Sequence, residues 1–118
     1  MLSGINRLKK KKDFEYVFKQ GRGLKQGFTS LKFTKNGLGA TRFGFVVGQK
    51  VSPKAVIRNK VKRRLREIAR SKLEDIKKGF DVVVVANKGA ETGSAEDTAA
   101  VFHHLLKTGK LFLLNDND

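Results

Sequence analysis

The sequence predicts an α+β fold in which helices pack against one sheet as a two-layer α-β sandwich. Its 118 residues are the length of one domain. Three stretches carry apolar residues at helical spacing, and the stretches between them either alternate like strands or are apolar throughout. Neither a repeat nor a linker interrupts the chain. We therefore expect one domain over residues 1–110, which begins with a basic arm over 1–12 and is followed by a tail over 111–118.

The first half of the chain predicts one helix and two strands. Three apolar side chains at i, i+3 and i+4 lie on one face of the predicted helix: Phe14, Val17 and Phe18. Gly21 is a suitable end for that helix. Residues 27–35 alternate as in a half-buried strand, and residues 42–50 form a second one. The Asn-Gly pair at 36–37 is a strong turn signal, so we expect the two strands to form a hairpin. Residues 22–25 carry a weaker strand signal.

Ser52-Pro53 predicts the start of a long helix, because serine is a favoured N-cap and proline is tolerated in the first turn. We expect the helix to reach about Lys77. Its inward stripe is apolar throughout: Ile57, Val61, Leu65, Ile68, Leu73 and Ile76. Residues 80–87 contain four consecutive valines, which favours a central strand buried on both faces and paired in parallel with an earlier strand.

The C-terminal part predicts one more helix and a short tail. Ser94 and Asp97 resemble a capping box at the start of the helix, and Gly109 ends it after about Lys107. The helix is expected to bury one apolar face: Ala99, Phe102, Leu105 and Leu106. In the tail, residues 111–114 are apolar enough to pack, and we expect residues 115–118 to fray.

The charge of the chain indicates a polyanionic partner. Lys and Arg total 26 against 11 Asp and Glu, which gives a formal net charge of +15. This self-repulsion works against the compact state unless a partner or salt balances it. Nucleic acid is the usual partner, and an anionic membrane or an acidic protein is the alternative. The excess charge and Gly4 also favour an arm that is not ordered in the absence of RNA.

Composition also bears on location. The chain has no cysteine, which excludes disulfides and thiolate metal sites and fits a reducing compartment. The arm has no apolar core typical of a signal peptide, and no apolar run approaches the roughly 20 residues that span a bilayer. We therefore expect a cytoplasmic protein that does not enter a membrane.

The long predicted helix carries an unusual excess of positive charge. Residues 54–72 contain nine Lys and Arg side chains and one acid, Glu67. On a helical wheel, six polar side chains lie opposite the apolar stripe: Asn59, Lys60, Lys62, Arg63, Arg66 and Arg70. Over about 25 Å of helix, these charges match the phosphates of a nucleic-acid backbone better than any small ligand. A purely solvated face normally interleaves Glu with Lys, and this one does not. Arg58 lies near the apolar sector, so we expect it to be partly structural.

The remaining titratable residues do not predict a protein catalytic centre. The acids are scattered, and the neighbouring pairs Glu74-Asp75 and His103-His104 each diverge by about 100° on a helix. A protein metal nuclease needs two or three clustered carboxylates. We therefore expect no catalytic side chain and no metal site in the chain.

The segment Arg58-Asn59-Lys60-Val61-Lys62-Arg63-Arg64-Leu65-Arg66 and its surroundings resemble bacterial ribonuclease P proteins. The family motif is of the type Arg-Asn-Arg-x-x-Lys-Arg. An Arg7-Leu8 arm precedes Asp13-Phe14, Gln49-Lys50 leads into the motif helix, and Lys78 to Asp81 leads into the valine-rich strand. The resemblance covers about residues 5–108. Two positions depart from the family: Lys60 replaces the usual arginine, and Lys32 stands where the family often has an aromatic side chain.

The resemblance implies the order α-β-β-β-α-β-α, with a third early strand and a left-handed β-α-β crossover around the motif helix. Sequence pattern alone predicts a right-handed crossover. By family resemblance, a separate RNA subunit catalyses Mg²⁺-dependent removal of the 5′ leader from precursor tRNA, and this RNA holds most of the Mg²⁺. The expected partners are ribonuclease P RNA and precursor tRNA, with one protein per RNA.

The resemblance also assigns site residues. The motif helix would bind the catalytic RNA through Arg58, Asn59, Lys60, Lys62, Arg63, Arg66 and Arg70. The leader would lie in a cleft with Phe14, Phe18, Lys32 and Lys50, and the basic arm would contribute Arg7, Lys9 and Lys10. Aromatic rings beside cations suit single strands, although Phe14 and Phe18 alternatively only pack their helix onto the sheet. The alternative function is a structural RNA-binding protein, for instance a ribosomal one.

Overall fold

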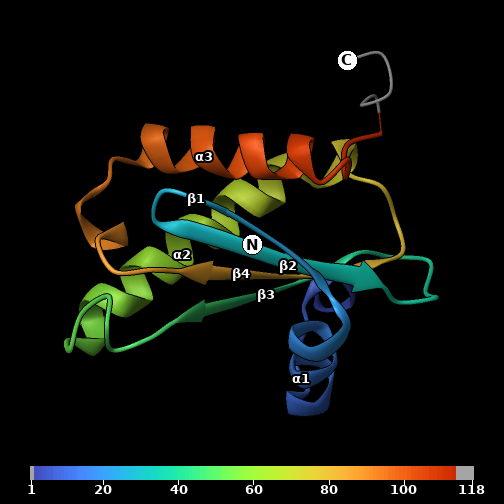
Figure 1. The fold of residues 1–118 in the computed structure, drawn as a ribbon, viewed down its shortest axis with the longest axis horizontal. Coiled ribbons are helices and arrows are strands. Elements are labelled where there is room, and N and C mark those ends of the chain that lie inside the picture. The colour runs from blue at the N-terminus through green and yellow to red at the C-terminus, as the bar shows by residue number, and fades with distance from the viewer. Residues whose placement is uncertain (1, 114–118) are drawn as a thin grey trace.

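A computed structural model describes residues 2–113, which form one four-stranded sheet with helices on both faces (Figure 1). Three short 3-10 turns accompany the main elements: Gly4–Asn6, Leu73–Asp75 and Ala90–Thr92. The helices and strands are α1 (Lys11–Gln20), β1 (Arg22–Gln26), β2 (Thr29–Lys35), β3 (Arg42–Val47), α2 (Ala55–Lys72), β4 (Phe80–Ala86) and α3 (Ala95–Thr108). This order confirms the α+β class and the third early strand. No helix among these residues is long and apolar enough to cross a membrane.

The sheet has the order β1-β2-β4-β3, with β4 in a central position. β2 is antiparallel to both β1 and β4, whereas β3 is parallel to β4. The predicted hairpin between residues 27–35 and 42–50 is therefore wrong, because β4 lies between those two strands. β4 takes this place because its apolar side chains point to both faces, and Val82, Val83 and Val84 are all 0% exposed. The hairpin partner of β2 is β1, joined by a turn that contains Gly27 at φ +57°.

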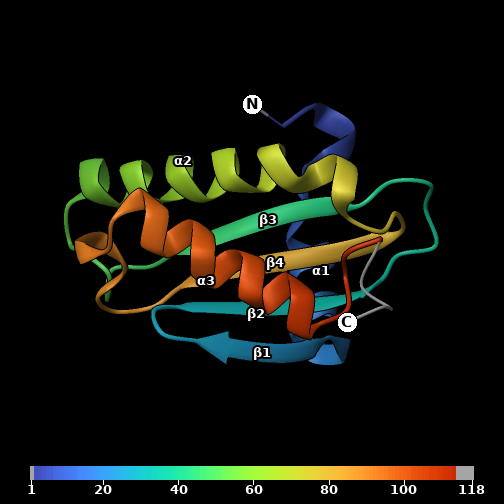
Figure 2. The same ribbon diagram turned by 90° about the horizontal axis from the view of Figure 1, so that it is seen from above.

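The connection from β3 to β4 crosses over through α2. In Figure 2, β3 and β4 both run from right to left, β4 lies below β3, and α2 returns on the same side of the sheet as α3. The crossover is therefore left-handed, as the family resemblance implied and as sequence pattern alone did not. The helix begins later than expected, at Ala55, and Ser52 Oγ accepts a hydrogen bond from the Lys54 N–H (3.2 Å) in the turn that precedes it.

Two apolar clusters cover the two faces of the sheet. The larger lies under α2 and α3, where Val61, Leu65 and Phe102 pack against Val82 and Val84. The smaller lies under α1 and joins Leu8, Val17 and Val83. Packing also continues past residue 110, because Leu111 is fully buried in the larger cluster. The predicted fraying of 115–118 lies outside the described residues.

The N-terminal arm is packed, against the expectation that it is not ordered without RNA. Leu2 belongs to the larger apolar cluster and Leu8 to the smaller one, so the arm passes around the β3 edge of the sheet from one face to the other. The Leu8 N–H donates to the Phe43 carbonyl (2.8 Å) on that edge. Two buried leucines and a backbone hydrogen bond therefore hold the arm despite its charge.

The seat of α1 on the sheet depends on a glycine. The Phe14 ring lies directly over Gly44 of β3, in the space that a side chain at position 44 would need. The Leu8 Cβ is 3.2 Å from the same point. Only the absence of a Cβ at residue 44 lets the helix approach the strand so closely.

We predict that Gly44→Ala destabilises the protein by about 1–3 kcal/mol, because the new methyl group overlaps the Phe14 ring and overpacked sites cost energy of this order. The free energy of unfolding in urea measures the effect. Gly39→Ala is the matched control, since no atom lies within 4 Å of its Cβ position. Equal stability of the two variants would contradict the packing of Phe14 on Gly44.

Candidate nucleic-acid interface

The cationic face of α2 is turned away from the core. Val61, Leu65 and Ala69 are buried beneath the helix. On its outer side, Asn59, Lys60, Arg63 and Arg70 are exposed, whereas Lys62 and Arg66 are half-buried. The amphipathic division predicted from the sequence is confirmed. A row of cations without interleaved acids, apart from Glu67, follows this outer face.

Two arginines of α2 serve the fold. Arg58 Nη1 donates to the carbonyls of Ser52 (3.0 Å) and Pro53 (2.9 Å), and so closes the turn that precedes the helix. Arg64 Nη1 donates to the Gly93 carbonyl (2.8 Å), and so ties α2 to the loop before α3. The helical wheel gave a warning for Arg58 but none for Arg64. Both guanidinium groups are hydrogen-bonded to backbone carbonyls, unlike the exposed cations on the outer face of α2.

Arg70 shares its charge with the one acid of the helix. Its Nε lies 2.9 Å from Glu67 Oε2, and this hydrogen bond lowers the pKa of the Glu67 carboxyl. Both side chains are about half exposed. An exposed pair of this kind stabilises little, so Arg70 can exchange Glu67 for a stronger anion at small cost.

A groove of about 330 Å³ runs beside β3 and brings together parts of the predicted site. We call it the edge groove, because β3 is an edge strand. Residues from four segments line it, among them Arg7 and Lys9 of the arm, Phe14 of α1, Phe45 of β3, and Lys62 and Arg66 of α2. Cations from two directions thus flank two aromatic rings. This is the combination that binds single-stranded nucleic acid, with phosphates held by charge and bases stacked on rings.

The other predicted cleft residues are only partly brought together. Phe18 is 40% exposed, and its backbone carbonyl accepts a hydrogen bond from Lys32 Nζ (2.8 Å). Lys32 thus places its charge at the C-terminal end of α1, where the helix dipole favours a cation. Lys50 is exposed in the turn at residues 48–51 and does not line the edge groove. Only Phe14 of the four lines that groove.

Sequence reasoning missed an ion-pair network that fixes α1 over the sheet. Arg42 of β3 binds both oxygens of the buried Asp81 of β4 (2.8 and 2.7 Å), and its Nη1 lies 3.6 Å from Asp13 of α1. The hydrogen bonds to Asp81 raise the pKa of Arg42, and the charge of Asp13 adds to the effect. Only the parallel register of β3 and β4, which sets Arg42 beside Asp81, would have revealed the pair.

The same network bears on metal binding. Asp13 of α1 and Asp81 of β4 both form ion pairs with Arg42. Among residues 2–113, no three His, Asp or Glu side chains come close enough to hold a metal ion. The carboxylates of these residues therefore form no cluster that fits a magnesium ion.

Comparisons with known proteins agree with this geometry. The family model described as Ribonuclease P matches residues 2–110. A ribonuclease P protein component from Alkaliphilus oremlandii is 36% identical over 114 residues, which is 97% of each chain. The Thermotoga maritima ribonuclease P protein component is 45% identical over 82 residues, 70% of this chain and 69% of its own.

Solved structures show the same fold. The Staphylococcus aureus RNase P protein superposes with a TM-score of 0.84 at 29% identity, over 91% of this chain and 97% of its own. The Thermotoga maritima RNase P protein gives 0.79 at 37% identity, over 86% and 96%.

The fold and the cationic face of α2 together define a small α+β protein with an RNA partner. Within that class, the chain belongs to the ribonuclease P protein family.

We predict that Arg58→Ala lowers the free energy of unfolding by about 1–2 kcal/mol, because it removes two hydrogen bonds from a guanidinium group. Arg63→Ala, an exposed neighbour on the same helix, is the control and should change stability by less than about 0.5 kcal/mol. Thermal and urea unfolding of both variants provide the measurement. A larger loss for Arg63→Ala would assign that side chain to the fold and not to the interface.

Proposed function

We propose that this chain is the protein subunit of ribonuclease P and assists RNA-catalysed removal of the 5′ leader from precursor tRNA. The observation that carries the proposal is the edge groove, where cations of α2 and of the arm flank Phe14 and Phe45. The family supports it, since the protein components of ribonuclease P belong to a ribonuclease. The catalytic step is assigned to the RNA subunit.

In this proposal the outer face of α2 binds the catalytic RNA. The side chains of Asn59, Lys60 and Arg63 are exposed and make no hydrogen bond or ion pair within residues 2–113. Arginine suits this role, because its planar group contacts a phosphate with two donors. Lys60 keeps the charge of the motif position and forms simpler, single-point contacts. Arg58 supports the same surface indirectly, by holding the turn before the helix.

The single-stranded leader is assigned to the α1 side of the sheet. Phe14 lies in the edge groove, and Phe18 presents a ring that is 40% exposed. Lys32 stands where the family often has an aromatic side chain that stacks on a base. Its amino group donates a hydrogen bond to the Phe18 carbonyl at the end of α1. We therefore expect leader binding to depend on Phe18 and on charge more than on a stack of several rings. Lys50 would meet the RNA strand beyond the end of β3, in the turn that follows it.

The remaining parts of the proposal follow from the RNA partner. Mg²⁺ is assigned mainly to the RNA subunit, and the lack of a carboxylate cluster among residues 2–113 is compatible with this assignment. Once the RNA phosphates crowd together, the positive protein lowers their mutual repulsion, so less Mg²⁺ is needed. We propose one protein per RNA, precursor tRNA as the substrate, and the cytoplasm as the compartment.

We predict that the purified protein alone does not cleave precursor tRNA, and that it stimulates a bacterial ribonuclease P RNA at low Mg²⁺. The measurement is the rate of 5′-leader release from labelled precursor tRNA at several ratios of protein to RNA. No stimulation over RNA alone at any ratio would contradict the proposal. A structural RNA-binding protein would give that result while still binding RNA.

We predict that Arg66→Ala weakens binding to the catalytic RNA and lowers the slope of log affinity against log salt by about one, because one phosphate contact is lost. Filter binding at several salt concentrations measures both. Lys110→Gly is the matched control: it also removes one positive charge, beyond the end of α3, and glycine suits the φ of +58° at that position. If Arg66→Ala binds with the affinity and slope of the control, the α2 face is not in the interface.

A further inference from the structure

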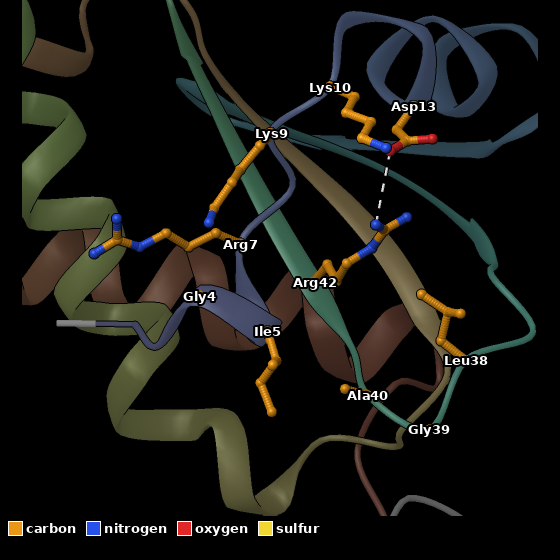
Figure 3. Close-up of a pocket in the computed structure, with 10 residues that line it drawn as sticks. All are labelled: Gly4, Ile5, Arg7, Lys9, Lys10, Asp13, Leu38, Gly39, Ala40 and Arg42. Carbon is orange, nitrogen blue, oxygen red and sulfur yellow. Dashed lines mark ion pairs between the residues drawn. The ribbon is translucent and has the colours of Figure 1, made fainter.

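A second concave surface lies on the other side of the arm from α2. It is an open bowl of about 540 Å³ between the arm, the start of α1 and the loop from β2 to β3 (Figure 3). We call it the N-terminal bowl. The residues that matter in it are Ile5, Lys9, Lys10, Leu38 and Gly39. Its volume falls within the roughly 300–1,000 Å³ that is typical of ligand sites.

The charge in the bowl is one-sided. Arg7, Lys9, Lys10 and Arg42 line it, against one acid, Asp13. Figure 3 shows Arg42 paired with Asp13, and Arg42 is also bound to Asp81. The amino groups of Lys9 and Lys10 form no ion pair within residues 2–113. Two ammonium groups are therefore available to an anion.

The apolar part of the bowl has no partner in the fold. Ile5 is 72% exposed and Leu38 is 52% exposed, although both are large aliphatic side chains. Beside Leu38, nothing lies within 4 Å of the position of a Cβ at Gly39, so the backbone there is open to a flat group. Ile5 and Leu38 come from segments more than thirty positions apart in the chain and line the same hollow.

An RNA nucleotide that has left its stack has both features that this surface would complement. Its phosphate is an anion for Lys9 and Lys10, and its flat base and sugar offer apolar area to Ile5 and Leu38. The one carboxylate of the bowl is paired with Arg42, so it is not a free side-chain acceptor for the edge of a base. Contacts of this kind, to the phosphate and to the flat face of a base, do not depend on which base is bound.

We propose that the N-terminal bowl is a second contact for the catalytic RNA, where it binds one unstacked nucleotide of that RNA. The two hollows share Arg7 and Lys9, so a strand can pass from one to the other around the arm. This inference rests on the proposed function for its partner. A flat membrane or an acidic protein surface would not reach into a hollow beside the arm as a single nucleotide does.

The test uses the full chain and the catalytic RNA of a bacterial ribonuclease P as the probe. Leu38→Ala should lower affinity about fivefold with an unchanged salt slope, because it removes apolar contact and no charge. Lys10→Ala should lower the salt slope by about one. Leu38→Met keeps the apolar contact and should bind like the unaltered protein. Lys110→Gly removes one positive charge outside the bowl, and it should also bind like the unaltered protein. Thermal unfolding verifies that every variant is folded, and Ile5→Ala replaces Leu38→Ala if that one is not.

A photoreactive benzoylphenylalanine in place of Leu38 identifies the contact directly. Reverse-transcription stops should map the crosslink to unpaired or bulged nucleotides of the RNA. Crosslinks only to base-paired nucleotides would overturn the inference. So would unchanged affinity in Leu38→Ala and an unchanged slope in Lys10→Ala, while Arg66→Ala still weakens binding; the proposed function would then stand alone. If Arg66→Ala has no effect either, both proposals fail.

Discussion

The burial of β4 on both faces is the constraint on which the rest of the structure depends. Val82 and Val84 point to one side and Val83 to the other, and none of them is exposed. A strand of this kind needs neighbours at both edges and cover above and below. β2 and β3 supply the edges, α2 and α3 cover one face, and α1 covers part of the other. Because β3 and β4 are parallel, α2 must return between them, and its polar side is left facing outward along the edge of the sheet.

The cations of this chain divide into two groups with different physical roles. Arg42, Arg58 and Arg64 are bound to carboxylates or to backbone carbonyls, and each joins two segments of the fold. Within residues 2–113, the side chains of Asn59, Lys60 and Arg63 on the outer face of α2 and of Lys9 and Lys10 in the arm make no such contacts. Arginine forms several directed hydrogen bonds at once, so it suits the first group. A net charge of +15 is thus compatible with folding, because some of the cationic side chains form hydrogen bonds and ion pairs that hold the fold together.

Sequence patterns predicted most of the elements and the outer face of α2, because these depend on local periodicity. The buried stripe with Val61 and Leu65, the central place of the valine strand and the Ser94 cap, whose Oγ accepts from the Asp97 N–H, are of this kind. The pairing of strands was not predictable in the same way. Asn36-Gly37 is a strong turn signal, yet a third strand enters between the strands that flank it. The burial of valines on both faces outweighed a local preference.

The site was predicted as separate pieces, and the fold supplies their arrangement. Nothing in the sequence sets Arg7 and Lys9 beside Lys62 and Arg66, because that neighbourhood depends on the path of the arm around β3. The role of Arg64 and the Arg42–Asp81 pair also depend on contacts between distant segments. Lys32 was expected in the cleft, but its bond to the Phe18 carbonyl required the register of β2 under α1.

The path of the arm has a further consequence for the free protein. An uncovered edge strand is a template on which another chain can add a strand, which leads to aggregation. The arm occupies the edge of β3 at Phe43, through the hydrogen bond from Leu8. At the opposite edge, β1 is only five residues long and carries Arg22 and Lys25. The N-terminal arm, which supplies positive charge for RNA, therefore also covers part of the β3 edge and reduces self-association of the sheet before any RNA is bound.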